Sequence, residues 1–346
     1  MYQQPPTPPQ YAHFVGIDIA AQTASVAWTT QPETVEPGFD IEQTLQGLET
    51  LQQRLRRHGC QPASTLVVME ATGTYWMRVA RTLHLAGYAV SVINPRQAHH
   101  FAQALLKQAK TDAIDAQTLA QLAALLQPAP WQPPGEVWEE VYQRLVERDN
   151  LVQMRQMLRN QLHALRQWPH IAQAVVARKQ QLLDAMQQQI DAIDRELERL
   201  LRNEDQWAAA AANLRSIKGI GLLSTAWLLV ITNGFTTCDD AEPLVSYLGL
   251  APHPCESGTS RRGHRRVGHA GHARARRVLY QASISASRYN PFIKAFYDRL
   301  IARGKPVKVA RCAAARKLVH LAWAVATKEQ LFDPNYQQHL QPALAA

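Results

Sequence analysis

Four short apolar runs alternate with amphipathic stretches over residues 11–127. Runs of this length predict buried strands, and the first two lie close enough to form a hairpin through Ala20–Thr23. Strands that alternate with helices are typical of an α/β domain. The predicted strands are Phe14–Ile19, Ala24–Thr30, Thr65–Met69 and Tyr88–Ile93, and the predicted helices are Ile41–His58, Tyr75–Ala86 and Ala98–Leu126.

A proline-rich linker, Gln127–Gly135, separates this region from two long helical stretches. Glu136–Trp168 and Ile171–Asn203 predict long helices that are broken at Pro169. The second carries apolar residues at alternating three- and four-residue steps, which is the spacing of a helix–helix seam. We expect an antiparallel helical hairpin or a coiled-coil oligomerisation arm, with seam residues Leu183, Met186, Ile190, Ile193, Leu197 and Leu200.

The chain of 346 residues is long enough for several domains. A disordered proline-rich lead at residues 1–10 has no signal-peptide layout, and no apolar run is long enough to span a membrane. Four cysteines are scattered without paired spacing, which favours a reducing cytoplasm over a disulfide framework. The predicted segments are an α/β domain at 11–130, a helical arm at 131–207, a mostly helical domain at 208–335 and a tail at 336–346.

Positive charge is concentrated at the C-terminal end of the chain. Residues 257–346 contain 17 lysine and arginine residues against three acids, whereas the whole chain has a net charge of only +9. Such asymmetry indicates a domain that binds a polyanion. Nucleic acid is favoured over an anionic membrane, because no basic stretch pairs with a large apolar face of Trp, Phe and Leu.

Two aspartates three residues apart, Asp112 and Asp115, occupy one face of a predicted helix. Two further acids, Asp18 and Glu70, lie within or at the end of predicted buried strands. An acid in such a place is costly unless it is paired or coordinates a metal. Each acid alone has an ordinary structural explanation as a surface or turn residue. Together the four predict a hard-cation site for phosphate chemistry.

A basic loop follows at residues 254–277, and its arginines suit bidentate phosphate contacts. Its glycines favour tight turns, and the irregular spacing of its histidines argues against a metal site. The candidate nucleic-acid contacts in this loop are Arg261, Arg262, Arg265, Arg266, Arg274, Arg276 and Arg277.

Ser257 and Gly258 open the basic loop. A serine beneath an arginine cluster has the chemistry to attack a phosphodiester, because cations stabilise the oxyanions that form. The ordinary alternative is a Ser-Gly turn. Upstream, Lys218, Gly219 and Gly221 form a Gly-x-Gly turn between predicted helices, whose amides could hold a DNA phosphate or simply join two helices.

Several sequence blocks together resemble the IS110 family of insertion-sequence transposases, which are bridge-RNA-guided recombinases. The blocks Gly16–Ala20, Met69–Gly73 and Lys110–Ala116 are similar to the DEDD, RuvC-like domain of that family. Ile217–Gly221, Tyr247–Pro252 and Ser257-Gly258 with the Arg/Gly tract that follows are similar to its C-terminal transposase domain. The resemblance extends from about residue 13 to 328.

The resemblance implies a ribonuclease-H-like fold in which Asp18, Glu70, Asp112 and Asp115 bind Mg²⁺ or Mn²⁺. It also implies that Ser257 forms a phosphoserine link to DNA, at a composite site completed between subunits. Glu256 precedes the serine and His272 stands where the family often has Asn, so Ser260 stays open as an alternative nucleophile.

The implied partners are double-stranded DNA at the element ends and target, a guide RNA, and further copies of the chain in a dimer or tetramer joined through the arm. The implied location is the bacterial cytoplasm, in association with the nucleoid. Three other functions are compatible with parts of the pattern. These are a metal-only endonuclease or junction resolvase in which water attacks, an actin-like ATPase, and a non-catalytic nucleic-acid-binding protein.

Overall fold

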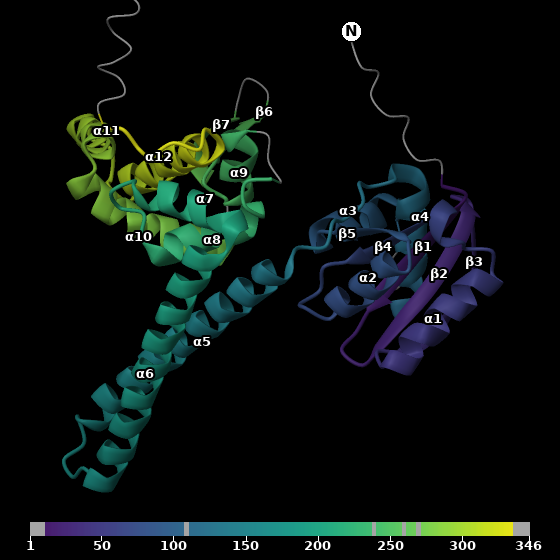
Figure 1. The fold of residues 1–346 in the computed structure, drawn as a ribbon, viewed down its shortest axis with the longest axis horizontal. Coiled ribbons are helices and arrows are strands. Elements are labelled where there is room, and N and C mark those ends of the chain that lie inside the picture. Colours follow the sequence, from purple (N-terminus) through teal and green to yellow (C-terminus); the bar gives the residue numbers. More distant parts are fainter. Residues whose placement is uncertain (1–10, 107–110, 237–239, 258–260, 268–270, 335–346) are drawn as a thin grey trace, which may run out of the picture. The chain divides into compact units, whose positions relative to one another are not determined.

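The computed structural model describes residues 11–106, 111–236, 240–257, 261–267 and 271–334, and within 253–267 it describes the backbone alone. The chain forms two compact units, residues 1–133 and 134–346 (Figure 1). The helical arm belongs to the second unit. Among the described residues, no helix is long and apolar enough to cross a membrane.

The first unit is built on a five-stranded mixed sheet. Its strands run in the order β3-β2-β1-β4-β5, with β1 antiparallel to β2 and parallel to β4. The predicted hairpin is confirmed, because β1 pairs with β2 and the Ala20 N–H donates to the Thr23 carbonyl (3.0 Å). The strands are β1 (His13–Ile19), β2 (Thr23–Gln31), β3 (Thr34–Glu42), β4 (Thr65–Glu70) and β5 (Ala89–Ile93).

Helices cover both faces of this sheet (Figure 1). One face packs against α1 (Leu45–Arg57) and α2 (Trp76–Leu85), around Leu51, Leu55 and Leu83. The other packs against α3 (Pro95–Ala104) and α4 (Asp112–Leu126). The linker beyond α4 follows the β5 edge, where the Trp131 N–H donates to the Val90 carbonyl (2.6 Å).

Two predicted helices of this unit were wrong in extent. The helix predicted from Ile41 begins at Leu45, because Ile41 belongs to edge strand β3 and the Thr44 hydroxyl caps the Gly47 N–H (3.0 Å). A separate β3 was not predicted, since Pro37 and Gly38 interrupt its pattern.

The single helix predicted over Ala98–Leu126 is two helices. The chain leaves α3 at Leu105, and Leu106 has a left-handed φ of 55°. A new helix, α4, then starts from Thr111, whose hydroxyl accepts the Ile114 N–H (3.3 Å). The sequence contains no Gly or Pro at this break, so composition alone suggested one continuous helix.

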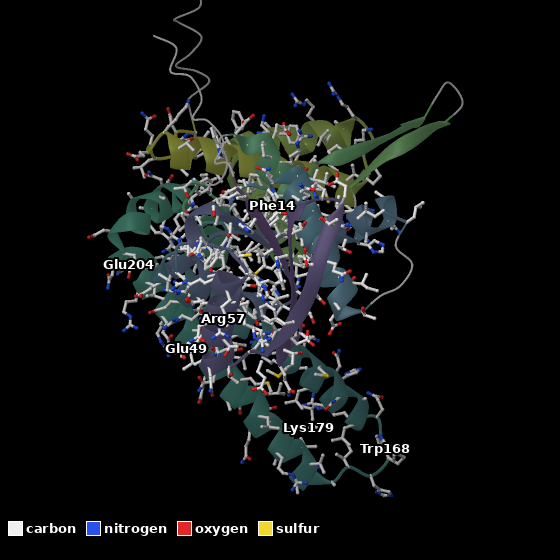
Figure 2. All side chains as sticks on the ribbon, turned by 90° about the vertical axis from the view of Figure 1, so that its right-hand side faces the viewer. Phe14, Glu49, Arg57, Trp168, Lys179 and Glu204 are labelled. Atoms are coloured by element: carbon white, nitrogen blue, oxygen red, sulfur yellow. The ribbon has the colours of Figure 1, made fainter. Side chains whose placement is uncertain are left out.

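In the second unit, α5 (Glu136–Leu165) and α6 (Gln173–Asn203) form the predicted antiparallel hairpin. Two ion pairs join them, Arg144–Glu196 (2.8 Å) and Arg148–Asp194 (2.5 Å). As the residue number rises along α5, the number of the partner on α6 falls, which is the pairing of antiparallel helices. Trp168 and Lys179 lie toward the far end of this arm (Figure 2). The predicted seam is buried at Leu183, Ile190, Ile193 and Leu197 and partly buried at Met186 and Leu200.

The base of the arm enters the core of a helical bundle. Leu197 and Leu201 of α6 pack with Trp207, Trp227 and the apolar faces of the later helices. The bundle consists of α7 (Asp205–Arg215), α8 (Leu222–Thr232), α9 (Ala241–Tyr247), α10 (Ala273–Tyr289), α11 (Pro291–Ala302) and α12 (Val307–Thr327). The segment predicted as a basic loop contains a two-stranded ribbon, β6 (Pro252–Ser257) and β7 (Arg261–Val267).

The backbone of α4 comes very close to strand β1 at Gly16. A Cβ at this position would lie 2.1 Å from the Ala116 carbonyl oxygen and 2.3 Å from the Ala120 nitrogen. Both are backbone atoms of α4, so no side-chain rotation could relieve the clash.

Replacing Gly16 with Ala should therefore push α4 away from β1 and destabilise the first unit by roughly 1–3 kcal/mol. Urea unfolding of the full chain, with hydrogen exchange read at the amides of β1 and α4, measures this loss. The control is Gly135→Ala, because nothing lies within 4 Å of a Cβ built there. Equal stability of the two variants would contradict the close-approach argument.

Candidate active site

The four predicted acids come from three elements of the first unit. Asp18 lies near the end of β1, Glu70 is the last residue of the neighbouring parallel strand β4, and Asp112 and Asp115 occupy the first turn of α4. The β1–β4 register pairs Ile17 with Met69, so the next residue on each strand is an acid of the set. Parallel pairing therefore brings Asp18 and Glu70 to the same end of the sheet.

The approach of α4 to Gly16 brings the other two acids to this end. Side chains alternate along a strand, so Gly16 and Asp18 share the face of β1 that α4 covers. Ala116 lies over Gly16, and the turn that precedes Ala116 contains Asp112 and Asp115. Asp18, Glu70 and Asp115 are half-buried, whereas Asp112 is exposed.

The other three carboxylates lie close enough to Asp18 to influence its protonation. Burial first, and then the charges of Asp115, Asp112 and Glu70 in that order, together raise the pKa of Asp18 from an ordinary 3.8 to about 6. The Asp112–Asp115 pair is stabilised by the positive N-terminal end of α4. The Thr72 hydroxyl donates a hydrogen bond to Glu70 Oε1 (2.9 Å).

These residues suit a hard divalent cation by their chemistry, since all four offer carboxylate oxygens. A bound cation would offset the excess of negative charge, which together with burial raises the pKa of Asp18 to about 6. Within the described residues, no three acidic, histidine or cysteine side chains already stand in metal-coordinating positions. The arrangement is a cluster of mutually repelling carboxylates rather than a finished coordination sphere.

Two residues that position this cluster were not among the predicted site residues. Gly16 admits the backbone of α4, and Thr111 starts α4 directly before the acid pair. Both carried a sequence signal. Thr111 precedes two acids in the pattern of a helix N-cap, and Gly16 lies two residues before Asp18 on the same strand face.

Ser257 ends β6 and is paired in register with Arg261, the first residue of β7. Glu256 pairs with Arg262 in the same ribbon. Gly258 and Ser260 lie outside the described residues, and the side chains of Ser257, Arg261, Arg262, Arg265 and Arg266 are likewise outside them. The backbone register therefore gives the location of the candidate nucleophile at the end of an arginine-rich ribbon.

The remaining arginines of the tract lie in the first two turns of α10. Arg274 approaches Asp149 of α5 (3.9 Å), and Arg276 donates to the Leu248 carbonyl (3.5 Å). Arg277 is exposed. Three cations at the positive end of a helix oppose its dipole, which favours an anion nearby. Arg274 and Arg276 have structural contacts in addition to any role toward phosphate.

His272 begins this helix. The ring Nδ1 of His272 accepts a hydrogen bond from the Ala275 N–H (3.2 Å). The backbone N–H of His272 donates to the Tyr247 carbonyl (3.0 Å). Burial, with the nearby Arg274 charge, lowers the pKa of His272 and so favours the neutral ring that this cap requires. An Asn would accept the same kind of hydrogen bond. His272 therefore does the same capping work as the Asn that the family often has at this position.

The Gly-x-Gly turn also has a packing role. Gly219 has a φ of 108°, and a Cβ there would lie 2.5 Å from Ala286 Cβ on α10. The Lys218 carbonyl accepts a hydrogen bond from the buried Asn290 amide (3.3 Å). Gly221 begins α8 without a side-chain cap, and nothing lies within 4 Å of a Cβ built there. The Ile220 N–H within this turn donates to the Ile217 carbonyl (2.9 Å).

Titration of Asp18 should make the stability of the first unit depend on pH. Its pKa is higher in the folded protein than in the unfolded chain, so the folded state holds the proton more tightly. The free energy of unfolding should fall as the pH rises from about 4 to about 6 and stay lowered above that. Asp18→Asn should remove this fall and stabilise the metal-free unit at pH 7.5 by roughly 1–2 kcal/mol, once solvent screening is allowed for.

The measurement is hydrogen exchange of the β1 and β4 amides in the full chain with a chelator present, at several pH values. Asp40→Asn is the matched control, since Asp40 accepts a hydrogen bond from Ser25 and has the same side-chain size. A variant at Asp18 that kept the wild-type pH profile would overturn the electrostatic account.

Comparisons with known proteins agree with the two-part layout. Residues 15–167 match the family model of DEDD transposases of the IS110 type, and residues 211–298 match that of the transposase IS116/IS110/IS902 family. The pilin gene-inverting proteins of Moraxella lacunata and Moraxella bovis are each 28% identical over 334 residues, which covers 94% of this chain and 99% of theirs. An insertion element IS110 protein of Streptomyces coelicolor is 31% identical over 130 residues, covering 38% of this chain and 31% of that protein.

Proposed function

The chain belongs to the IS110 family of transposases, and we propose that it cuts and rejoins insertion-element DNA through attack by Ser257. The family match establishes an enzyme of DNA cleavage and transfer. The serine, the metal and the guide RNA are the proposed details. The observation that carries the proposal is the meeting of Asp18, Glu70, Asp112 and Asp115 at one end of a sheet.

The strand order supports a ribonuclease-H-like assignment of the first unit. A three-stranded antiparallel meander is followed by two parallel strands, and α4 crosses the face of β1 beside the first acid. The four carboxylates would hold Mg²⁺, or Mn²⁺ in its place. When bound, the cation would polarise the scissile phosphate and offset negative charge on the attacking and leaving oxygens.

In the proposed cleavage step, Ser257 Oγ attacks the phosphorus and loses its proton. The bond from phosphorus to the 3′ oxygen breaks, and that oxygen takes up a proton and leaves as a 3′ hydroxyl. The DNA stays joined to the protein as a 5′ phosphoserine ester. In the joining step a 3′ hydroxyl of another strand attacks this ester, and Ser257 regains its proton. The ester conserves the bond energy, so rejoining needs no ATP.

The basic ribbon and the first turn of α10 would supply phosphate contacts in this scheme. Guanidinium groups match phosphate oxygens in pairs, and their field lowers the cost of the oxyanions that form. The candidate contacts are Lys218, Gly219, Gly221, Arg261, Arg262, Arg265, Arg266, Arg274, Arg276 and Arg277. Their concentration at the C-terminal end also supports a bridge RNA as a second polyanion, in addition to double-stranded DNA.

The arm is the proposed surface for assembly into a dimer or tetramer. Large apolar side chains are exposed on both of its helices, at Met154 and Met157 of α5 and at Leu182 of α6. Exposed apolar groups on neighbouring helices favour contact with another protein surface. The acids and the serine belong to different units, so a composite active site completed between subunits is consistent with this proposal.

Ser257→Ala should abolish the covalent intermediate and reduce strand cleavage by roughly 10³-fold or more. The assay incubates the full chain with element-end DNA, labelled at the 3′ end, together with RNA and Mg²⁺. Adducts are resolved under denaturing conditions and their attachment site is mapped. Ser260→Ala is the matched control and should retain the adduct.

The same assay separates the alternatives. Loss of the adduct in Ser260→Ala, with retention in Ser257→Ala, would move the nucleophile to Ser260. Cleavage by Ser257→Ala with no adduct in the wild-type protein would favour the metal-only endonuclease, in which water attacks.

Metal binding has a readout that needs no DNA. Excess Mg²⁺ or Mn²⁺ should slow hydrogen exchange in β1 and α4 of the wild-type chain, by about 1.4 kcal/mol at a concentration tenfold above the dissociation constant. Asp18→Asn and Asp115→Asn should lose this protection. Glu49→Gln should keep it, because Glu49 is exposed on α1, across the sheet from α4 (Figure 2). Equal protection in all variants would place any bound cation elsewhere.

A further inference from the structure

A second cleft in the first unit is lined by residues that the proposed reaction does not use. This open cleft, here called the Trp28 cleft, has a volume of about 410 Å³. It is lined by His13, Trp28, Thr30, Glu36 and His58. They come from β1, β2 and β3 and from the residue that ends α1. This volume is of the order of small-ligand sites.

Aromatic rings form one wall of the Trp28 cleft. The rings of Trp28 and His58 lie 4.1 Å apart between centroids and are tilted by 31°. Phe39 extends the group, 5.9 Å from Trp28 and 6.3 Å from His58. Trp28 is buried, whereas the ring of His58 belongs to an exposed residue. The result is an aromatic stack whose outer member is accessible.

Polar atoms in the same cleft can make hydrogen bonds. His13 Nδ1 is buried and has no hydrogen-bond partner among the described residues. A buried polar atom without a partner is uncommon and costly, which makes it a candidate for contact with a ligand. Glu36 and Thr30 line the cleft with exposed acceptor and hydroxyl groups.

Cations gather beside this stack. The last turn of α1 contains Arg54, Arg56 and Arg57, and the Arg54 guanidinium lies over the Phe39 ring at 4.9 Å. Arg56 interacts with the Tyr88 hydroxyl, while Arg57 is exposed (Figure 2). Cations suit the negative end of a helix, which explains part of this cluster. The helix dipole does not explain the aromatic cleft that adjoins it.

The Trp28 cleft is separate from the acids. His13 begins β1, and Asp18 lies five residues further, which is roughly 16 Å along a strand. Val15 and Ile17 belong to the core beneath α1, whereas Gly16 contacts α4, so His13 and Asp18 also belong to opposite faces of the sheet. A group bound at the cleft would not reach the carboxylates.

We propose that the Trp28 cleft binds one unpaired nucleobase of a single-stranded nucleic acid. The base stacks on the His58–Trp28 pair, its polar edge meets His13 and Glu36, and a neighbouring phosphate contacts Arg57. Aromatic stacking beside cations is the usual way to hold an unpaired base, while bases inside a duplex are already stacked on one another. The inference rests on the nucleic-acid partnership proposed above and adds a site for it outside the catalytic centre.

The test compares oligonucleotides that carry equal charge but differ in one base. Full-length wild-type chain is titrated with a single-stranded RNA, with the matching DNA, and with versions of each that contain one abasic position. We expect the abasic position to weaken wild-type binding roughly fivefold to twentyfold at fixed salt. His58→Ala should bind both versions equally. His100→Ala, an exposed histidine on α3, should behave as the wild type does.

Arg57→Ala supplies a second signature. It should keep the preference for the intact base but reduce the slope of log affinity against log salt by about 0.7, as expected for one lost phosphate contact. A 5-iodouridine at the same position should crosslink to a peptide that contains Trp28 or His58. RNA and DNA are distinguished by which of the two shows the larger base-dependent difference.

An unchanged base preference in His58→Ala, or crosslinks confined to residues 208–335, would overturn the proposal. Circular dichroism checks that His58→Ala is folded, and the crosslink in wild-type protein does not depend on any variant. If only the cleft proposal is wrong, the base preference is absent, while salt-dependent binding and the serine adduct are still observed. Loss of the serine adduct with a retained base preference would instead overturn the proposed catalytic step alone.

Discussion

The close contact of α4 with β1 at Gly16 is the constraint on which the first unit depends. Without a Cβ at this position, two backbones come within a distance that no side chain permits. The contact sets how closely α4 packs on β1, and the first turn of α4 contains half of the acid cluster. A helix displaced outward by one methyl group would carry Asp112 and Asp115 away from Asp18. The packing of α4 on the sheet and the position of two candidate acids therefore depend on the same glycine.

The N-terminal acids and the apolar strands that position them could be predicted from sequence, because each apolar run has strand length and two acids interrupt or end such runs. The seam of α6 could be predicted for a similar reason, since its spacing is regular over several turns. The break between α3 and α4 could not, because Leu106 adopts a left-handed φ in a stretch without Gly or Pro. Edge strand β3 was missed because Pro37 and Gly38 obscure its alternation.

The contacts that organise the C-terminal bundle were hidden for another reason. Gly271, with a φ of 99°, could not carry a Cβ without meeting the backbone of Tyr247 and Gly249, and the next residue, His272, caps α10. Gly219 similarly lies against Ala286. Gly271 and His272 stand in a basic tract whose composition suggests only nucleic-acid binding. Tertiary packing assigns part of the tract to holding α9, α8 and α10 together.

The distribution of charge follows the division of the two proposed reactive groups, the acids and Ser257, between the two units. The first 256 residues contain 25 acids against 20 lysines and arginines, whereas the last 90 are strongly basic. Carboxylates that already repel one another disfavour a phosphate on their own, and an arginine-rich ribbon attracts it. A phosphodiester therefore has a strong electrostatic partner at the ribbon before it has one at the acids. In the proposed reaction, cleavage is favoured only when a bound nucleic acid and a cation together offset the charge of the acid cluster, which would make assembly a condition of the chemistry.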